Sequence, residues 1–210
     1  MGTAMIWGAG GGIGRALAAK LVADGWMVIA ASRQIEEGDE PALHRVAVDV
    51  SDADSVARAV AAAGDRVDRV DLWLYAAGDI TAAKVADLEP ADWQRIVDAN
   101  LTGAYLAAHY SLPLLAPEAH LIFLGAVVER ISLPRLAPYA AAKAGLEALA
   151  AVLAKEERRR RVTVVRPAAV ATSFWDKVPF KRPPDAAEPG QIAEQILELY
   201  HAGRQGVLDL

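Results

Sequence analysis

Short apolar runs alternate with segments of helical periodicity along the whole of this 210-residue chain, and this alternation limits its possible folds most strongly. The apolar runs are hydrophobic at nearly every position, which is typical of strands that helices cover on both faces. Strands and helices that alternate in this way form parallel sheets with right-handed crossovers. The sequence therefore predicts an α/β fold, a doubly wound parallel sheet of about seven strands with helices on both faces.

Seven apolar runs are expected as strands. They are Ala4–Trp7, Val28–Ala31, Val46–Val50, Leu72–Ala76, Leu121–Leu124, Val162–Val165 and Val207–Leu210. The expected helices are one through Ile13, Leu17 and Leu21, one from a cap at Ser51 to Gly64, one from Pro90 through Leu106, one over roughly Pro138–Glu157 and one over Gln191–Tyr200. We see no repeat and no linker, so residues 1–210 are expected to form a single domain.

Composition and charge exclude several classes of partner. The net charge of −5 gives no electrostatic reason to expect a nucleic acid. No apolar run reaches the ~18 residues of a membrane helix, and no basic segment precedes a cleavage site, so we expect no membrane association and a cytoplasmic location. Cysteine is absent and the four histidines are scattered, so we expect no metal site.

A glycine-rich turn, Gly8-Ala9-Gly10-Gly11-Gly12-Ile13-Gly14, follows the first predicted strand and opens the first predicted helix. Glycines allow the backbone to approach a pyrophosphate closely, and the start of the helix presents aligned N–H donors to it. The turn therefore predicts a dinucleotide site in this position. The alternative is a tight turn that binds nothing.

The end of the second predicted strand bears on which dinucleotide binds. An NAD site usually has an acidic residue there, bonded to the ribose 2′-hydroxyl. This chain has Ser32 and Arg33 instead, which can receive a 2′-phosphate. We therefore expect NADP(H) to be preferred over NAD(H). The alternative is that Arg33 is a solvated loop residue.

Tyr139 and Lys143 are four residues apart in Tyr-Ala-Ala-Ala-Lys, which places them one turn apart on the same face of a helix. A phenol has a pKa of about 10, and a nearby cation favours its ionised form. The pair can therefore make Tyr139 an acid–base catalyst near neutral pH. The alternative is an accidental pair on a solvated helix face.

These motifs, in this order, resemble those of the short-chain dehydrogenase/reductase family over nearly the whole chain. The residues that carry the resemblance are Gly8, Gly12 and Gly14 of the turn, Asp49-Val50 after the third strand, Asn100, the Tyr139/Lys143 pair, and Arg166-Pro167-Ala168 with Thr172. The resemblance implies a Rossmann-like fold and an NAD(P)-dependent oxidoreductase that acts on a small molecule with a carbonyl or a related C=N or C=C group.

The resemblance also implies roles for individual residues. Tyr139 would donate a proton to the substrate, Lys143 would bind the ribose hydroxyls and lower the tyrosine pKa, and Asn100 would hold a water in the proton relay. The residues expected to bind the cofactor are Gly8, Gly10, Gly12, Ile13, Gly14, Ser32, Arg33, Asp49, Val50, Ala76, Ala77, Gly78, Tyr139, Lys143, Pro167, Val170 and Thr172.

The chain departs from the family at four places. Trp7 replaces the threonine before the glycine turn, Tyr75-Ala76 replaces the family's Asn-Asn, and Ala168 replaces a glycine. The catalytic serine, roughly thirteen positions before the tyrosine, is replaced by Ala126. Loss of one such donor costs on the order of 10²–10³ in rate. The alternative function is therefore a nucleotide-binding protein with little turnover, such as a sensor, a partner subunit or a scaffold.

Two further expectations concern the surface. Residues 173–188, rich in proline and charge, follow the sixth predicted strand and form either a surface loop or a substrate lid. The alanine-rich helices near Pro90–Ala107 and Pro138–Glu157 can pack closely across a two-fold axis. Together with the resemblance, these helices predict a homodimer or homotetramer.

Overall fold

A parallel sheet organises the molecule. In the computed structural model, the described residues (2–34 and 40–210) form a seven-stranded sheet in the order β3-β2-β1-β4-β5-β6-β7, and each neighbouring pair is parallel. The strands are β1 (Thr3–Trp7), β2 (Met27–Ser32), β3 (Leu43–Ala47), β4 (Val70–Tyr75), β5 (Leu115–Leu124), β6 (Arg161–Arg166) and β7 (Gly206–Asp209). The predicted doubly wound, Rossmann-like fold is confirmed.

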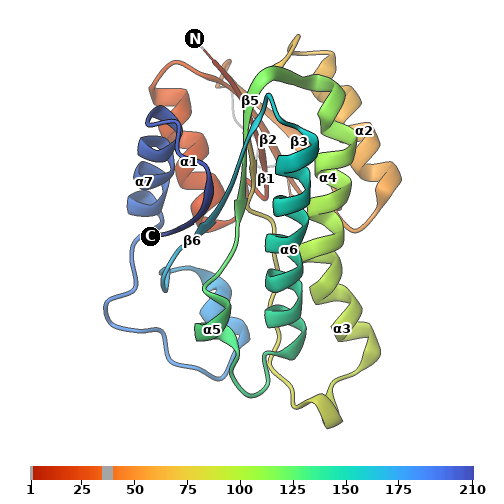
Figure 1. Cartoon of the computed structure of the whole chain (residues 1–210), viewed down its shortest axis with the longest axis vertical. Coiled ribbons are helices and arrows are strands. Elements are labelled where there is room, and N and C mark those ends of the chain that lie inside the picture. Colours follow the sequence, from red (N-terminus) through yellow and green to blue (C-terminus); the bar gives the residue numbers. More distant parts are fainter. Residues whose placement is uncertain (1, 35–39) are drawn as a thin grey trace.

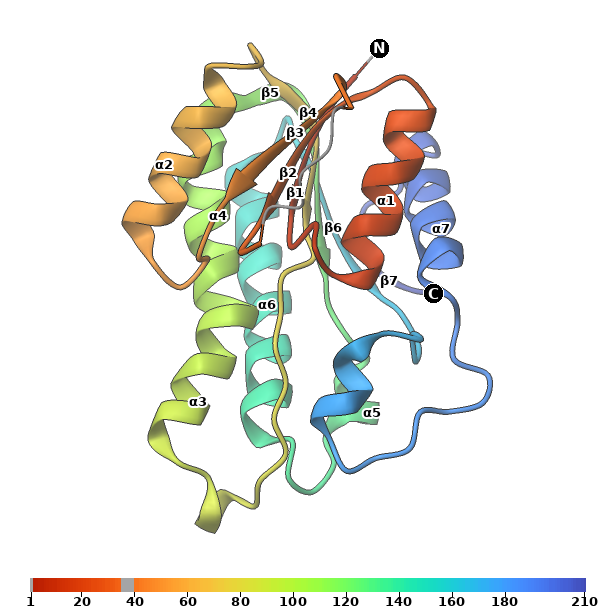
Figure 2. The ribbon, with the colours of Figure 1, turned by 180° about the vertical axis from the view of Figure 1, so that it is seen from behind.

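Helices cover both faces of this sheet (Figures 1 and 2). The helices are α1 (Gly12–Ala23), α2 (Ala53–Gly64), α3 (Pro90–Val97), α4 (Gly103–Ser111), α5 (Val128–Ile131), α6 (Ala137–Glu156) and α7 (Pro189–His201). The short turns are η1 (Val85–Asp87), η2 (Asp98–Thr102), η3 (Leu112–Leu114) and η4 (Ser173–Lys177). Helices α1 and α7 pack on one face, and α2, α4 and α6 pack on the other. No helix among the described residues has the length and apolarity that a membrane crossing requires.

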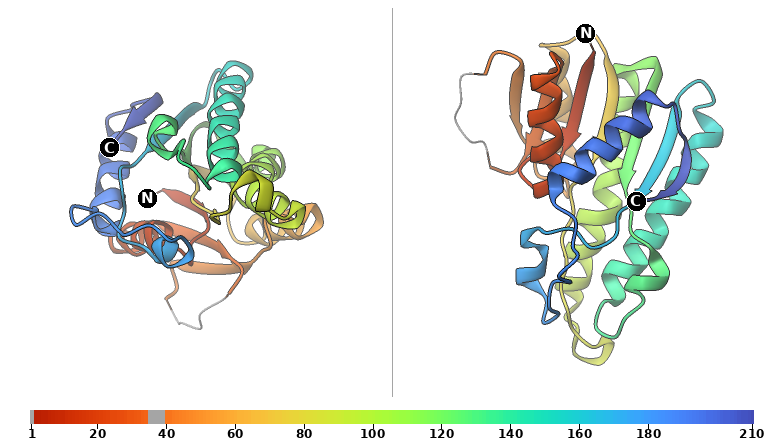
Figure 3. Two further views of the ribbon diagram at one scale, coloured as in Figure 1. Left: turned by 90° about the horizontal axis from the view of Figure 1, so that it is seen from below. Right: turned by 90° about the vertical axis from the view of Figure 1, so that its left-hand side faces the viewer.

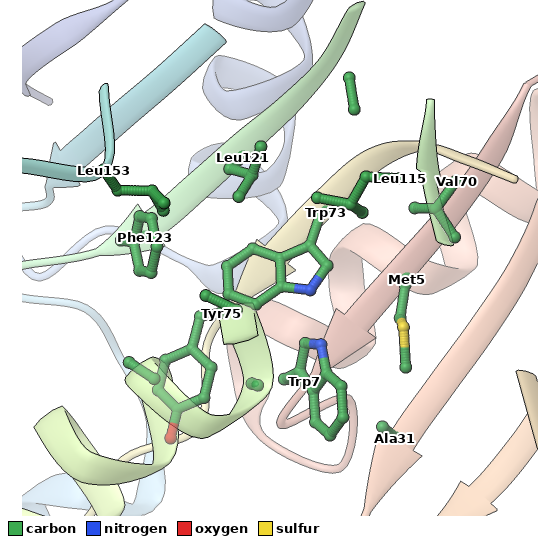
Figure 4. Packing of buried hydrophobic residues seen from close by; sticks show 14 of the residues in the cluster. Met5, Trp7, Ala31, Val70, Trp73, Tyr75, Leu115, Leu121, Phe123 and Leu153 are labelled. Atoms are coloured by element: carbon green, nitrogen blue, oxygen red, sulfur yellow. The ribbon is translucent and has the colours of Figure 1, made fainter. Parts of the chain in front are cut away.

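Side chains alternate between the two faces along each strand, so the sheet separates two cores. Ala4 and Ile6 of β1 belong to the core under α1 and α7. Met5 and Trp7 belong to the core under α2, α4 and α6. Figure 4 shows the second core, in which large aromatic side chains such as Trp73 fill the space beside the alanine-rich helices.

The third strand differs from its predicted position. It covers Leu43–Ala47, three residues earlier than the predicted Val46–Val50, and pairs with β2. β3 lies at the edge of the sheet, where His44 and Arg45 are tolerated because the strand is only partly covered. Because the first residues of this strand include polar side chains, the apolar run in the sequence begins later than the strand does.

The predicted cap of α2 at Ser51 is wrong. Asp52 is the cap, because its carboxylate accepts a hydrogen bond from the Asp54 amide at 2.9 Å. The Ser51 hydroxyl instead donates to the Asp49 carboxylate at 2.7 Å. Ser51 therefore binds Asp49, two residues after the end of β3.

The helix predicted from Pro90 through Leu106 contains an irregular turn. Its segments α3 and α4 are joined by η2, a π-helical turn in which the Gly103 amide donates to the Asp98 carbonyl, five residues back. Such wide turns are rare and often mark functional sites. Asn100 lies at the centre of this turn.

Candidate active site

A large cavity of about 1840 Å³ lies at the carboxyl ends of the strands, where open sheets bind ligands. Seen from below in Figure 3 (left), α5, the η4 turn and the end of α3 surround this edge of the sheet. The cavity is lined by all the predicted site residues except Asn100, namely Gly8, Gly10, Gly12, Ile13, Gly14, Ser32, Arg33, Asp49, Val50, Ala76, Ala77, Gly78, Tyr139, Lys143, Pro167, Val170 and Thr172. Ala126 also lines it.

The glycine turn fits a dinucleotide. Gly8 has a φ of +85°, and a Cβ there would lie 2.4 Å from the Ala77 amide nitrogen. A Cβ at Gly14 would lie 2.4 Å from the Gly8 carbonyl oxygen, and one at Gly12 would lie 2.8 Å from the Thr172 side chain. The cap of α1, Gly11, makes no side-chain hydrogen bond to the first turn, so the helix start keeps the N–H donors that a pyrophosphate accepts from.

The end of β2 and the residues after β3 form the outer part of the same cavity. The Asp49 carboxylate accepts hydrogen bonds from the Ser51 hydroxyl and amide, which together with the more distant Arg33 guanidinium hold its pKa below the usual value. The Ser32 hydroxyl donates to the Gln34 carbonyl at 2.6 Å. Arg33 also lines this part of the cavity, so its cation lies near the Asp49 carboxylate, which the lowered pKa keeps ionised.

Tyr139 and Lys143 lie one turn apart near the start of α6. The Lys143 ammonium is buried, donates to the Leu124 carbonyl at 2.7 Å and lies 5.6 Å from the centroid of the Tyr139 ring. Burial lowers the pKa of Lys143 to about 8 and raises the pKa of Tyr139 to about 12. Desolvation is the cause of the raised value, so the lowering of the tyrosine pKa by Lys143 that the resemblance implies stays a prediction. The phenol is protonated at neutral pH, which suits a proton donor.

Asn100 lies behind Gly78 rather than at the cavity wall. It is fully buried, and its amide nitrogen donates to the Asp79 carbonyl at 2.7 Å and to the Ile96 carbonyl at 2.8 Å. Its Oδ1 has no hydrogen-bond partner, and a Cβ placed on Gly78 would approach that oxygen to 2.8 Å. The glycine therefore keeps open the space in front of a buried acceptor.

No hydroxyl occupies position 126. Ala126 is buried and lines the same cavity as Tyr139. Ser132, the nearest serine in the sequence, is exposed, and its hydroxyl donates to the Val128 carbonyl at 2.8 Å. Ala126 therefore contributes no hydroxyl donor to this part of the cavity.

The segment after β6 contributes to the cavity wall. The Phe174 ring meets the Tyr139 ring edge-on, with centroids 6.2 Å apart. Lys177 pairs with the buried Asp79 carboxylate, which also binds Arg95 of α3. Sequence reasoning missed this cluster. The available signal was a charged residue directly after the Gly78 turn, but nothing in the sequence links it to a lysine 98 positions later.

Comparison with known proteins decides the family. Residues 2–182 match the family model described as short chain dehydrogenase. The chain belongs to this family. Both the fold and the order of the motifs agree with membership of this family.

One curated relative shows how much of the chain can be aligned with a dehydrogenase of known name. The serine 3-dehydrogenase of Agrobacterium fabrum is 33% identical over 128 residues, which are 58% of this chain and 51% of that enzyme. This chain thus spans about half the length of that relative.

Two solved structures superimpose on the whole chain. The 3-ketoacyl-(acyl-carrier-protein) reductase from Brucella melitensis, complexed with NADH, is 25% identical with a TM-score of 0.88, covering 100% of this chain and 96% of that one. The alcohol dehydrogenase from the archaeon Thermococcus sibiricus, complexed with 5-hydroxy-NADP, is 25% identical with a TM-score of 0.89 and the same coverages. One protein of similar structure is therefore complexed with NADH and another with 5-hydroxy-NADP.

Proposed function

We propose that the protein is an NADP(H)-preferring reductase of a carbonyl or a related C=N or C=C group. The observation that carries this proposal is the placement of Tyr139 and Lys143 one turn apart on α6, in the same cavity as the glycine turn. A glycine turn that fits a nucleotide, and a partly buried phenol beside a buried ammonium in the same cavity, suit hydride chemistry coupled to proton transfer.

Tyr139 acts as the acid in this proposal. When bound, NADPH supplies the hydride. The Tyr139 phenol, which is protonated at neutral pH because burial raises its pKa to about 12, donates its proton to the substrate atom that gains electrons. Lys143, whose pKa is lowered to about 8, is still mostly protonated at neutral pH and stabilises the phenolate that remains. Asn100 holds a water through its unpartnered Oδ1 and so helps to return a proton to Tyr139.

The preference for NADP(H) rests on the end of β2. Arg33 and Ser32 line the cavity, and the strand ends without the acidic residue that binds an unmodified ribose. A guanidinium forms strong charge-assisted hydrogen bonds with a phosphate. We therefore propose that Arg33 binds the 2′-phosphate.

Ala126 is the observation that favours a second candidate, a nucleotide-binding protein with little turnover. Without a serine hydroxyl at this position, the chain has one donor fewer for a developing oxyanion. A substrate that supplies its own hydrogen bond, or an imine or enone, depends less on that donor. With such a substrate the protein can still act as a reductase.

The two candidates are separated by binding and turnover measured on the same preparation. NADPH affinity is measured first by fluorescence titration, and NADPH oxidation is then followed over a panel of ketones, aldehydes, imines and enones. Turnover of any class above the rate without protein supports the reductase. Tight NADPH binding without oxidation on the whole panel supports the binding protein.

We also propose that the protein forms a homodimer or homotetramer through α4 and α6. The outer faces of these helices carry exposed large apolar side chains, among them Tyr105, which is 49% exposed, and Val152, which is 52% exposed. Such side chains gain stability when a second copy covers them. A monomer mass by light scattering at micromolar concentration would contradict this assembly.

A further inference from the structure

Tyr75 joins the aromatic core to the turn that carries Asn100. It is the last residue of β4 and is fully buried, with its ring stacked near Trp73 at a centroid distance of 6.1 Å. Its hydroxyl leaves this apolar core and donates to the Ala99 carbonyl at 2.8 Å. Figure 4 shows the ring among its apolar neighbours, with the hydroxyl at the edge of the cluster pointing away from Trp73.

The turn is shaped to receive this hydroxyl. Ala99 and Asn100 both belong to the π-helical segment η2. A Cβ placed on Gly103, which directly follows that segment, would lie only 2.5 Å from the Tyr75 hydroxyl oxygen. No other residue type at position 103 leaves room for the bond. The phenol and the glycine therefore fit each other across the core.

Asn100 is held from two sides as a result. Its side-chain amide is fixed by the carbonyls of Asp79 and Ile96, at 2.7 and 2.8 Å. Its backbone is fixed at the preceding peptide, whose carbonyl accepts from Tyr75. Asp98 and Ala99 also line the cavity, so a movement of this turn reaches the site. The polar bonding lost where Tyr75 and Ala76 replace the family's two asparagines is thus replaced, in part, by a phenol bond to the turn.

We propose that Tyr75 is a positioning residue whose hydroxyl, through the Ala99 carbonyl, holds Asn100 in the orientation that the proton relay requires. The inference rests on the proposed function of Asn100 and deepens it. Phenylalanine at position 75 would fill the core equally well but would leave the Ala99 carbonyl without this donor. The Ala99 carbonyl, which is partly buried in the cavity wall, seeks another partner when it loses this donor, and the wide turn can rearrange to supply one.

Ser111 offers a matched control within the same core. It is fully buried, and its hydroxyl accepts a hydrogen bond from the Trp73 indole at 3.0 Å. Ser111→Ala therefore removes the bond from Trp73 and a long hydrogen bond to the Met5 sulfur at 4.0 Å, but it touches neither η2 nor Asn100. A merely structural role for Tyr75 predicts that the two variants behave alike.

The first measurement needs no turnover. Nuclear magnetic resonance of the full chain reports the Asn100 side-chain amide signals and the hydrogen exchange of the amides of residues 98–103. Tyr75→Phe is expected to shift those signals and to accelerate that exchange, whereas Ser111→Ala leaves both as in the wild type. Unchanged signals and exchange in Tyr75→Phe overturn the proposal, whatever the activity.

The second measurement uses an accepted substrate from the panel. Tyr75→Phe is expected to lower kcat about fivefold, the rate equivalent of one neutral hydrogen bond, with the KM for NADPH unchanged. Ser111→Ala is expected to keep the wild-type kcat. Equal kcat values in the two variants overturn the positioning role. A wild type without turnover contradicts the proposed function, and the resonance measurement then decides the role of Tyr75 alone.

Discussion

Lys177 donates a hydrogen bond from its ammonium to the buried Asp79 carboxylate at 2.6 Å, although the two residues are 98 positions apart. The same carboxylate binds the Arg95 guanidinium of α3 and accepts from the Ile80 amide. One carboxylate directly after Gly78 therefore ties the η4 turn to the end of β4 and to α3. Phe174 of the same turn meets the Tyr139 ring, so this tie fixes one wall of the cavity.

Asp79→Asn is expected to loosen the η4 turn. The amide keeps the size of the carboxylate but loses its charge, and both cations are about half exposed, so the expected effect is modest, about two- to fivefold. Limited digestion with chymotrypsin should cleave at Phe174 or Phe180 faster by that factor. Lys20→Gln, which breaks an exposed pair with Glu194, is the control. Equal cleavage rates in Asp79→Asn and the wild type would show that the pair does not hold the turn.

Arg33→Ala is expected to weaken NADPH binding by about 10- to 100-fold while changing NADH binding less than threefold. The reason is the loss of charge-assisted hydrogen bonds to the 2′-phosphate, worth about 1.5–3 kcal/mol. Fluorescence titration with each cofactor measures the change. Arg158→Ala, which alters an exposed arginine after α6, is the control. Equal wild-type affinities for the two cofactors, with no effect of the substitution, would sink the 2′-phosphate assignment.

His120 is expected to make the fold sensitive to acid. It is fully buried and shares a hydrogen bond of 2.7 Å with the Thr163 hydroxyl, and burial together with the Arg161 charge lowers its pKa to about 4. The unfolded chain takes up this proton near pH 6.5 and the folded chain only near pH 4. The contribution of the neutral His120 to the free energy of unfolding is therefore fully present above about pH 6.5. This contribution falls, by up to about 3 kcal/mol, as the pH drops towards 4.

Chemical unfolding at a series of pH values measures this loss. His120→Gln should remove much of the fall in the free energy of unfolding between pH 6.5 and 4, and the exposed His109 provides the control variant His109→Gln. If the free energy of unfolding falls equally with pH in the wild type and in His120→Gln over this range, the acid sensitivity belongs to the carboxylates instead.

Ala126→Ser is expected to raise the rate on ordinary ketones and aldehydes but not on the native substrate. The added hydroxyl restores a donor aimed at the developing oxyanion, which is worth about tenfold or more. It adds little volume, although Ala126 is only 7% exposed and a substrate adapted to the methyl group would be crowded. NADPH oxidation by both forms over one panel measures the change. A uniform gain across the panel would refute this adaptation.

The sequence predicted the local parts of the site and missed the parts that depend on distant contacts. The glycine turn and the Tyr139/Lys143 pair were predictable because their chemistry lies in residues a few positions apart. The β3 edge strand was misplaced because partial exposure removed the continuous apolar signal.

Long-range contacts explain the remaining differences. The hydrogen bond between Tyr75 and the turn at Asn100 was not predicted because it joins residues of two different elements. The raised pKa of Tyr139 follows from burial among side chains such as Phe174, and the pairing of Asp79 with Lys177 follows from the fold alone. None of these contacts is marked by a periodic pattern of residues in the sequence.

The role of Tyr139 as proton donor is tested by comparing NADPH oxidation by the wild type and by Tyr139→Phe on the same accepted substrate, with NADPH affinity measured for both. The variant keeps the ring and loses only the phenol proton. We predict a loss of kcat of about 10²–10⁴-fold, with NADPH affinity within about twofold of the wild type. Full activity in Tyr139→Phe would contradict the account, because another group would then have to donate the proton.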